Sequence, residues 1–239
     1  MTTLEKKYVN DNNIIEIGVD EVGRGPMFGR VYTAAVILPK QETNDETSTG
    51  IFQYSLLKDS KKFSSKKKIK EVYDYIIENC IDYEIQYETE KVIDDINILQ
   101  ATQKSMHKCI QKLIQKNKLT PDNTHLLIDG NYFKPHTSFD KDNEIIQCYN
   151  HTCVKGGDNT YCSIAAASIL AKVARDKYIE EICSVYPVID EYYSILSNKG
   201  YGSKKHMEGI KNYGITPWHR KSFGICKTFD KVIDEKELR

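Results

Sequence analysis

The sequence has 239 residues, of which 40% are hydrophobic and 28% charged, a composition that is ordinary for a globular protein and unlike that of a disordered one. No run approaches the roughly 18 apolar residues of a membrane helix, and the amino terminus lacks the apolar core of a signal peptide. We therefore expect a soluble, cytoplasmic protein with no membrane partner. The seven cysteines contain no CxxC pair, which argues against a disulfide framework and against a zinc site of the usual spacing.

The charges are segregated along the chain, although the formal net charge is zero. Residues 58–70 hold seven lysines against one acid, for +6, and residues 197–222 hold six basic residues against one acid, for +5. Residues 78–95 compensate with seven acids against one lysine, for −6. A single charged run is usually a solvated face of the protein, but two basic segments favour a surface that binds nucleic acid.

The first predicted strand covers residues 14–19, which are rich in isoleucine and valine. It ends at Asp20 and Glu21, and the GRGP cluster that follows breaks the strand. Adjacent residues of a regular strand point to opposite faces, so the two acids can share one site only if the backbone turns there. Residues 31–38 are a second, buried strand that pairs with the first as a hairpin.

The remaining elements follow in chain order: a helix from Ser64 or Ser65 to about Asn79, a strand at 83–88, a long amphipathic helix at 91–118, strands at 125–129 and 144–154, and an alanine-rich helix at 161–184. We expect the apolar residues of the long helix to pack on the core; these are Ile96, Leu99, Met106, Ile110, Leu113 and Ile114. The pattern predicts one α/β domain over residues 1–239, with a core at 14–184 and a helical carboxyl-terminal extension at 185–239.

Two further acids repeat the design of the first strand end. Asp129 closes an apolar strand before a glycine, and Asp158 precedes the alanine-rich helix, whose positive end favours an ionised carboxylate. Four carboxylates that converge would repel one another unless they held hard divalent cations such as Mg²⁺ or Mn²⁺. The chemistry of such a site is two-metal phosphodiester hydrolysis. The alternative interpretation of each acid is purely structural, as an exposed turn residue or as a helix cap.

Several blocks of the sequence resemble the type 2 ribonuclease H (ribonuclease HII) family in order, over roughly residues 14–226. They are GVDEVGRGPMFG, LKDSKK, DINILQAT, LLIDGN, KGGDNTYCSIAAASILAKVARD, NKGYGSKKH and YGITPWHRKSF. The resemblance implies a ribonuclease H-like fold, with a central mixed five-stranded sheet flanked by helices and a helical extension. It also implies an endonuclease that cleaves the RNA strand of RNA–DNA hybrids and nicks duplex DNA 5′ to embedded ribonucleotides, leaving 3′-hydroxyl and 5′-phosphate ends.

The resemblance also assigns site residues. By position, the metal-binding and catalytic carboxylates are Asp20, Glu21, Asp129 and Asp158. The backbone of the glycine turn would approach the ribose 2′-hydroxyl, a tyrosine would stack on the next sugar, and basic residues would hold phosphates. These substrate-binding residues are Gly23, Arg24, Gly25, Lys61, Lys62, Tyr201, Lys204, Lys205 and His206. Asp176 is interpreted as a structural partner of a neighbouring arginine.

The chain departs from the family pattern at Phe28 and Arg30, where a small residue and a proline are common. We expect catalysis to be kept. The carboxyl terminus lacks a paired-aromatic motif for a sliding clamp, so we expect no such partner. We also expect a monomer with no obligate protein partner. Two rival interpretations stay open, a type 1 ribonuclease H or related nuclease and a noncatalytic nucleic-acid-binding protein. A nucleotide-binding enzyme is disfavoured, because neither GxGxxG nor GxxxxGK[ST] occurs.

Overall fold

The structure is a computed structural model that describes residues 3–40, 52–140 and 144–238. It separates into two compact units. The sheet unit comprises Met1–Glu21, Thr33–Gln86 and Ser105–Val173, and the helical unit comprises Val22–Tyr32, Tyr87–Lys104 and Ala174–Arg239. Within the described part of the chain, no helix is long and apolar enough to cross a membrane.

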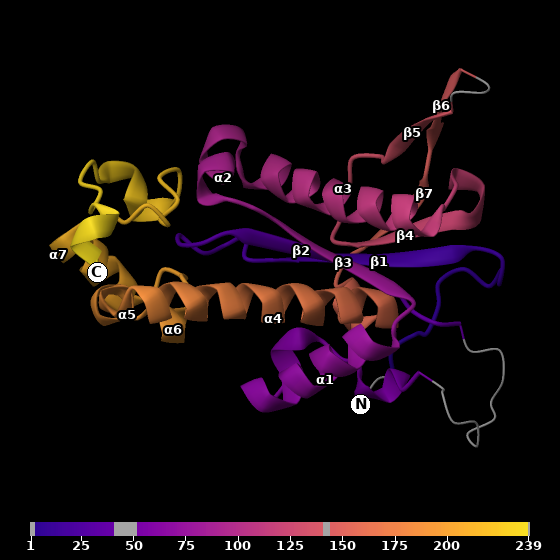
Figure 1. Ribbon diagram of the computed structural model, residues 1–239, viewed down its shortest axis with the longest axis horizontal. Helices are drawn as coiled ribbons and strands as arrows, with labels where there is room; N and C mark the ends of the chain where they lie inside the picture. The colour runs from indigo at the N-terminus through magenta and orange to yellow at the C-terminus, as the bar shows by residue number, and fades with distance from the viewer. Residues whose placement is uncertain (1–2, 41–51, 141–143, 239) are drawn as a thin grey trace. The chain divides into compact units, whose positions relative to one another are not determined.

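A mixed five-stranded sheet with the order β3-β2-β1-β4-β7 forms the centre of the sheet unit (Figure 1). Its strands are β1 (Ile15–Val22), β2 (Val31–Ile37), β3 (Asp82–Glu88), β4 (Thr124–Asp129) and β7 (Asn150–Val154). β4 runs parallel to both β1 and β7, with Val19 paired to Ile128 and Asp129 paired to Val154. Because these three strands are parallel, their carboxyl ends lie at one edge of the sheet.

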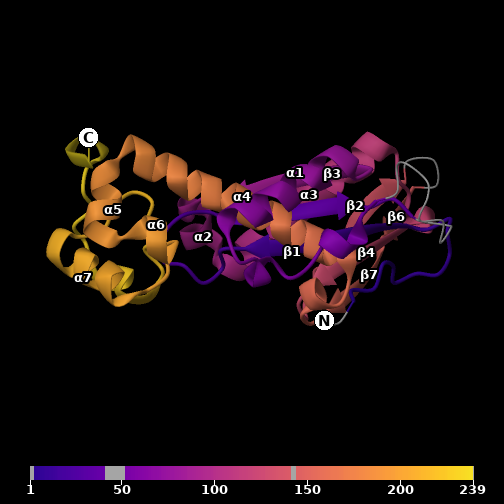
Figure 2. The same cartoon turned by 90° about the horizontal axis from the view of Figure 1, so that it is seen from below.

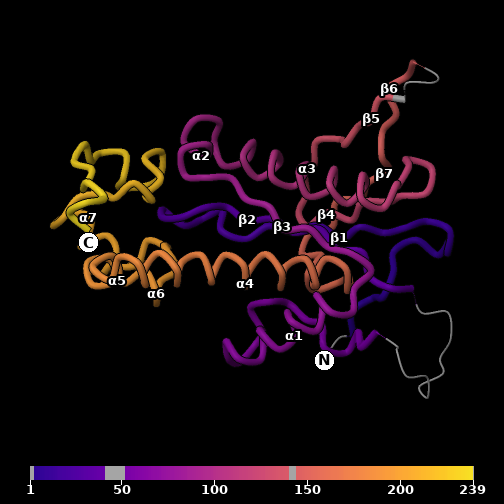
Figure 3. Tube along the Cα trace, viewed as in Figure 1, coloured from indigo at the N-terminus to yellow at the C-terminus, as the bar shows by residue number. Residues whose placement is uncertain are grey.

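The single strand expected at residues 144–154 is wrong, because this segment forms two strands in different sheets. β6 (Ile145–Cys148) pairs antiparallel with β5 (Thr137–Asp140), and only β7 joins the main sheet. The tube in Figure 3 shows the β5 and β6 pair standing away from that sheet. Tyr149 separates the two strands: its side chain is buried, its N–H donates to the carbonyl of His136 and its hydroxyl donates to the carbonyl of Leu119. A buried anchor at this point redirects the chain.

Helices cover both faces of the sheet unit. α3 (Ile98–Asn117) lies over one face, and α1 (Lys66–Asn79) and α4 (Cys162–Val185) lie over the other (Figure 1). The apolar core on the α3 face joins strand residues such as Ile17 and Val19 to Met106 and Leu113. On the α4 face, a methyl group added to Gly18 would meet the backbone of Ser163 at 2.3 Å. Successive side chains of β1 point to opposite faces of the sheet, so α3 packs on bulky side chains while α4 packs on the backbone at Gly18.

One predicted helix begins where the sequence indicates, and another is divided in two. α1 begins after Ser65, whose side chain accepts a hydrogen bond from the backbone of Lys68, as expected of an N-cap. The long helix expected at 91–118 is instead two helices, α2 (Glu90–Ile96) and α3, separated by Asn97 at a φ of 66°. A left-handed residue interrupts the helical hydrogen bonds and redirects the chain.

That break also changes which residues are buried. Met106, Ile110, Leu113 and Ile114 are buried, which confirms their expected core role. Ile96 and Leu99, which flank Asn97, are 38% and 36% exposed. The expectation that they pack on the core is therefore wrong.

The residues after 185 form short helices joined by irregular segments, within the helical unit. It contains α5 (Pro187–Tyr193), α6 (Ile195–Asn198) and α7 (Lys204–Tyr213), which Figure 2 shows gathered together. A methyl group at Gly209 of α7 would lie 2.2 Å from the carbonyl oxygen of Tyr192 in α5. The close approach of these two helices therefore requires glycine. The short 3-10 helices of the chain are Tyr54–Leu56, Ser60–Lys62, Pro121–Asn123, Gly157–Asn159, Gly224–Thr228 and Glu235–Leu238.

Candidate active site

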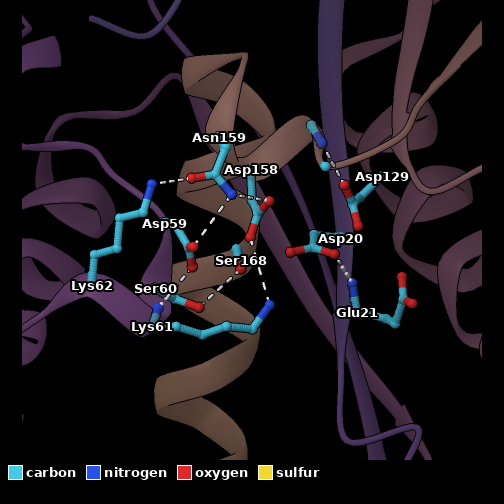
Figure 4. A network of polar contacts seen from close by, with 12 residues as sticks. Asp20, Glu21, Asp59, Ser60, Lys61, Lys62, Asp129, Asp158, Asn159 and Ser168 are labelled. Atoms are coloured by element: carbon cyan, nitrogen blue, oxygen red, sulfur yellow. Dashed lines mark hydrogen bonds and ion pairs between the residues drawn. The ribbon is translucent and has the colours of Figure 1, made fainter. Parts of the chain in front are cut away.

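Three carboxylates converge at the edge of the sheet where β1 and β4 end (Figure 4). Asp20, Glu21 and Asp129 each offer a ligand atom, and these atoms lie within 4.8 Å of one another. The register that pairs Val19 with Ile128 puts the next residues, Asp20 and Asp129, on adjacent strands. The N–H of Glu21 donates to Oδ1 of Asp20 at 2.7 Å. The two sequence-adjacent acids therefore contribute to one group of ligand atoms, although β1 continues through both of them to Val22.

The electrostatics of this acidic group fit a hard divalent cation. Asp20 is 4% exposed, and burial, followed by the charges of Glu21 and Asp129, raises its pKa well above the usual value. A hydrogen bond from Ser168 partly opposes that shift. Crowded carboxylate oxygens are the donor set that Mg²⁺ and Mn²⁺ prefer, and a bound cation would offset the repulsion. These residues can therefore hold a metal ion.

Asp158 does not belong to this group of ligand atoms in the part of the chain that the structure describes, although the charge of Asp129 acts on it. Its pKa is raised by burial first and then by the charges of Asp59 and Asp129. Burial and these like charges therefore act against the positive end of the helix, which was expected to favour the ionised form of Asp158. Asp129 fixes the loop that carries Asp158, because its Oδ1 accepts the N–H of Gly157 at 2.7 Å.

A polar network around Asp158 contains the two lysines predicted from the sequence (Figure 4). Nζ of Lys61 lies 3.9 Å from Oδ2 of Asp158, and Lys62 donates to the side-chain oxygen of Asn159. Asn159 in turn donates to Oδ1 of Asp158 at 3.1 Å and to Oδ2 of Asp59 at 3.3 Å. The two lysines thus lie beside buried acids as well as toward solvent.

Sequence reasoning gave no role to four members of this network, Asp59, Ser60, Asn159 and Ser168. Asp59 is buried, and its Oδ1 accepts the N–H of Lys61 at 2.8 Å. An acid followed by serine and lysines is a common turn former, and that pattern could have identified it. Ser168 lies within 3.1 Å of the hydroxyl of Ser60 and also contacts Asp20. Its place inside an alanine-rich helix gave no such indication.

The glycine turn lies in the helical unit, where a buried arginine binds its backbone. Arg220 is fully buried and donates to the carbonyl oxygens of Gly23 at 2.6 Å, Arg24 at 3.1 Å and Gly29 at 2.7 Å. Gly23 has a φ of 93°, and a methyl group there would lie 2.3 Å from Nε of Arg175. The turn therefore requires glycine at this position. Sequence reasoning gave Arg220 no role.

Arg175 is a second buried arginine that binds backbone in this unit. It donates to the carbonyl oxygens of Phe28 and Lys199, each at 3.0 Å, and of Arg30 at 3.2 Å. Burial lowers its pKa, and nearby groups that include Asp176 oppose that shift. This agrees with the interpretation of Asp176 as a partner of a neighbouring arginine.

The two departures from the family pattern are accommodated within the helical unit. Phe28 is fully buried, with its ring edge-to-face against His219 at 5.1 Å. The guanidinium of Arg30 stacks on the rings of Tyr87 and Tyr178, at 4.2 Å and 4.4 Å. Both side chains therefore pack on aromatic groups of their own unit.

The remaining predicted substrate residues lie on and before α7. Tyr201 is 52% exposed, and a methyl group added to Gly25 would lie 3.2 Å from its ring. Lys204 and Lys205 are exposed, and Lys204 lies 3.9 Å from Glu208. His206 is fully buried, and both of its ring nitrogens have partners within the protein. The expected phosphate contact of His206 is therefore wrong.

Solved structures show the fold to be that of a ribonuclease H. The structure is similar to the ribonuclease H2 from Pyrococcus horikoshii OT3, with a TM-score of 0.63 and 24% identity, covering 90% of this chain and 96% of that one. It is also similar to Bst-RNase HIII in complex with Mn²⁺, with a TM-score of 0.59 and 16% identity, covering 84% and 70%. These likenesses show the fold, which is that of the solved ribonucleases H, and the acidic group lies at its strand ends.

Comparison of the sequence with known proteins identifies the family to which the chain belongs. Residues 17–226 match the model of the family Ribonuclease HII. The chain is 43% identical to the ribonuclease HII of Parabacteroides distasonis over 211 residues, which cover 88% of this chain and 90% of that relative. The chain belongs to the ribonuclease HII family. It is an endonuclease that hydrolyses RNA in RNA–DNA hybrids, and its partner is nucleic acid.

Proposed function

We propose that this enzyme nicks duplex DNA on the 5′ side of embedded ribonucleotides, in addition to cleaving hybrids, and leaves 3′-hydroxyl and 5′-phosphate ends. The observation that supports this most is the acidic group, whose ligand atoms lie within 4.8 Å of one another at the ends of parallel strands. Two divalent cations, Mg²⁺ or Mn²⁺, would supply an activated water and stabilise the leaving oxygen when bound.

Asp20, Glu21, Asp129 and Asp158 are the catalytic and metal-binding residues of this proposal. The protein itself orients them. The N–H of Glu21 and the hydroxyl of Ser168 hold Asp20, and the N–H of Gly157 holds Asp129. Asp158 lies beside Lys61, which places a positive charge next to a buried acid. This lysine would then balance the acid until substrate and cations arrive.

Substrate recognition is proposed for the glycine turn, the tyrosine and the exposed lysines. Gly23, Arg24 and Gly25 would present backbone amides to the 2′-hydroxyl, and the exposed ring of Tyr201 would stack on the following deoxyribose. The fixed backbone of the turn supports this, because Arg220 donates hydrogen bonds to the carbonyl oxygens of Gly23 and Arg24 and so holds the turn in one conformation. Phosphates would be held by Lys61, Lys62, Lys204 and Lys205.

The organisation of the chain belongs to the same proposal. We retain one functional domain over residues 1–239, with a catalytic core at 14–184 and an extension at 185–239 that contributes to substrate binding. The enzyme would act as a cytoplasmic monomer with no obligate protein partner. Sedimentation of the chain with and without duplex tests the monomer directly.

The experiment that tests the activity maps product ends. A DNA duplex with one internal ribonucleotide is labelled at each end in turn and incubated with Mg²⁺, Mn²⁺ or EDTA. The proposal predicts one nick 5′ to the ribonucleotide, a 3′ end that a polymerase extends, and no reaction in EDTA. A nick on the 3′ side, or an end blocked by a cyclic phosphate, would contradict it.

A further inference from the structure

A buried chain of hydrogen bonds runs from Thr216 to the backbone of Tyr201 in the helical unit. The N–H of Thr216 donates to Nδ1 of His219 at 2.9 Å. Nε2 of His219 lies 3.0 Å from Nε2 of His206, and Nδ1 of His206 lies 2.9 Å from the carbonyl oxygen of Tyr201. Both imidazoles are buried, with 0% and 1% exposure. All four ring nitrogens of the pair are therefore used.

The two ends of this chain determine the tautomer of each ring. Two groups of Thr216 meet Nδ1 of His219, the backbone N–H at 2.9 Å and the hydroxyl at 2.8 Å. A backbone N–H can only donate, so we assign Nδ1 of His219 as an acceptor and place its proton on Nε2. That proton is donated to Nε2 of His206, so His206 carries its own proton on Nδ1. A carbonyl oxygen can only accept, and Nδ1–H of His206 meets one at Tyr201. The direction of every bond is thus fixed by the backbone groups at the two ends.

The surroundings keep both rings neutral. His219 lies between Phe28 and Tyr193, with centroid distances of 5.1 Å and 4.9 Å, and the ring of Tyr193 also lies 5.9 Å from that of His206. The hydroxyl of Tyr193 donates away from the pair, to the carbonyl of Gly214. Burial lowers the pKa of both histidines. A second proton on either ring would set two N–H groups against each other.

The carbonyl at the end of the chain belongs to the residue whose side chain is the exposed ring beside Gly25. The Tyr201 carbonyl also accepts a hydrogen bond from the N–H of Ser203 at 2.8 Å. The N–H of Tyr201 donates to the carbonyl of Asn198 at 3.0 Å. Since the ring itself is half exposed, its position depends on how firmly this backbone is held.

We propose that His206 and His219 are positioning residues for substrate recognition: their ordered tautomers hold the backbone of Tyr201, so that its ring stays beside Gly25 to meet the sugar. This rests on the function proposed above for Tyr201. This role accounts for two buried polar side chains whose ring nitrogens are bonded within the helical unit. It also replaces the phosphate-binding role first expected of His206.

Two amide variants of His206, each of which replaces one ring nitrogen, distinguish positioning of the Tyr201 backbone from support of the fold. In His206→Asn, the amide nitrogen takes the place of Nδ1 and keeps a donor for the Tyr201 carbonyl. In His206→Gln, the longer amide reaches the place of Nε2 and keeps a partner for His219 but gives nothing to Tyr201. We measure kcat/KM on a single-ribonucleotide duplex and on a long hybrid for both variants.

The expected result is a preference for the single-ribonucleotide duplex that falls about tenfold in His206→Gln, the size of one lost buried hydrogen bond. In His206→Asn the preference stays within about twofold of the wild type. Equal losses in the two variants, or equal losses on both substrates, would overturn the proposal, because a merely structural role predicts them.

A spectroscopic measurement tests the same proposal without any variant or substrate. Nitrogen-15 NMR of the wild-type protein near neutral pH is expected to show His206 protonated on Nδ1 and His219 protonated on Nε2. The opposite assignment, or a charged ring, overturns the proposal. Amide hydrogen exchange over residues 199–203 is expected to accelerate in His206→Gln and not in His206→Asn. If this pattern holds while Tyr201→Ala leaves the substrate preference unchanged, the positioning of the loop is supported and the role of Tyr201 in recognition fails.

Discussion

Replacing Asp20 with Asn is expected to stabilise the metal-free enzyme while it abolishes cleavage. Asp20 is buried, and its ligand oxygen lies within 4.8 Å of those of Glu21 and Asp129. At an effective dielectric constant of about 20, two charges at that distance repel by about 3 kcal/mol. Burial first, and then the charges of Glu21 and Asp129, raise the pKa of Asp20, so loss of its charge removes both costs. We therefore expect the free energy of unfolding to rise by about 1–3 kcal/mol in Asp20→Asn.

Urea unfolding at pH 7.5 in EDTA measures this difference. The asparagine oxygen can still accept the N–H of Glu21, so local geometry is kept. Asp74→Asn is the matched control, because it removes an exposed acid paired with Lys70 at 2.6 Å and should cost at most about 0.5 kcal/mol. Added Mn²⁺ should stabilise the wild type and not Asp20→Asn. An Asp20→Asn protein less stable than the wild type in EDTA would refute the reasoning.

Three other outcomes are expected. Replacing Lys61 and Lys62 with Ala should weaken binding to all duplexes alike and flatten the dependence of affinity on salt. If the dependence on salt is unchanged, the two lysines belong to a solvated face and do not bind phosphate. Tyr201→Ala should lose more activity on a single-ribonucleotide duplex than on a long hybrid, while Tyr201→Phe keeps most of both, and equal losses in Tyr201→Ala would argue against recognition. Acid should destabilise the protein through His136, whose pKa burial lowers from 6.5 to about 4. As the pH falls, His136 is protonated in the unfolded chain before it is protonated in the folded protein. The free energy of unfolding that depends on this difference is therefore fully present above pH 6.5 and decreases toward pH 4, by at most about 3 kcal/mol. Urea unfolding across this range should show a smaller decrease in His136→Gln.

Strand ends were the most predictable part of the site. The apolar runs before Asp20 and Asp129 have the composition of buried strands, and a glycine follows each acid closely. Parallel pairing in register then brings the two acids together. Residue pattern alone therefore located the acidic group. It could not show that Asp158 lies outside this group of ligand atoms, because that depends on the packing of a separate loop.

Other features were not predictable for physical reasons. The break at Asn97 depends on a single left-handed residue, which leaves the hydrophobic spacing of the two helices unchanged. Arg175 and Arg220 look like surface charges in a sequence, although buried backbone carbonyls bind both. His206 was misread because two lysines precede it, yet it lies four residues before the buried Ile210 on one helix face, and that spacing could have identified it.

Single-turnover cleavage of a duplex with one ribonucleotide, compared between the wild type and Asp129→Asn in Mg²⁺, measures whether the acidic group at the strand ends carries out the cleavage. We expect one nick 5′ to the ribonucleotide by the wild type. We expect none by Asp129→Asn, although it binds the duplex with unchanged affinity. Cleavage by Asp129→Asn at a near-normal rate would contradict this role of the acidic group.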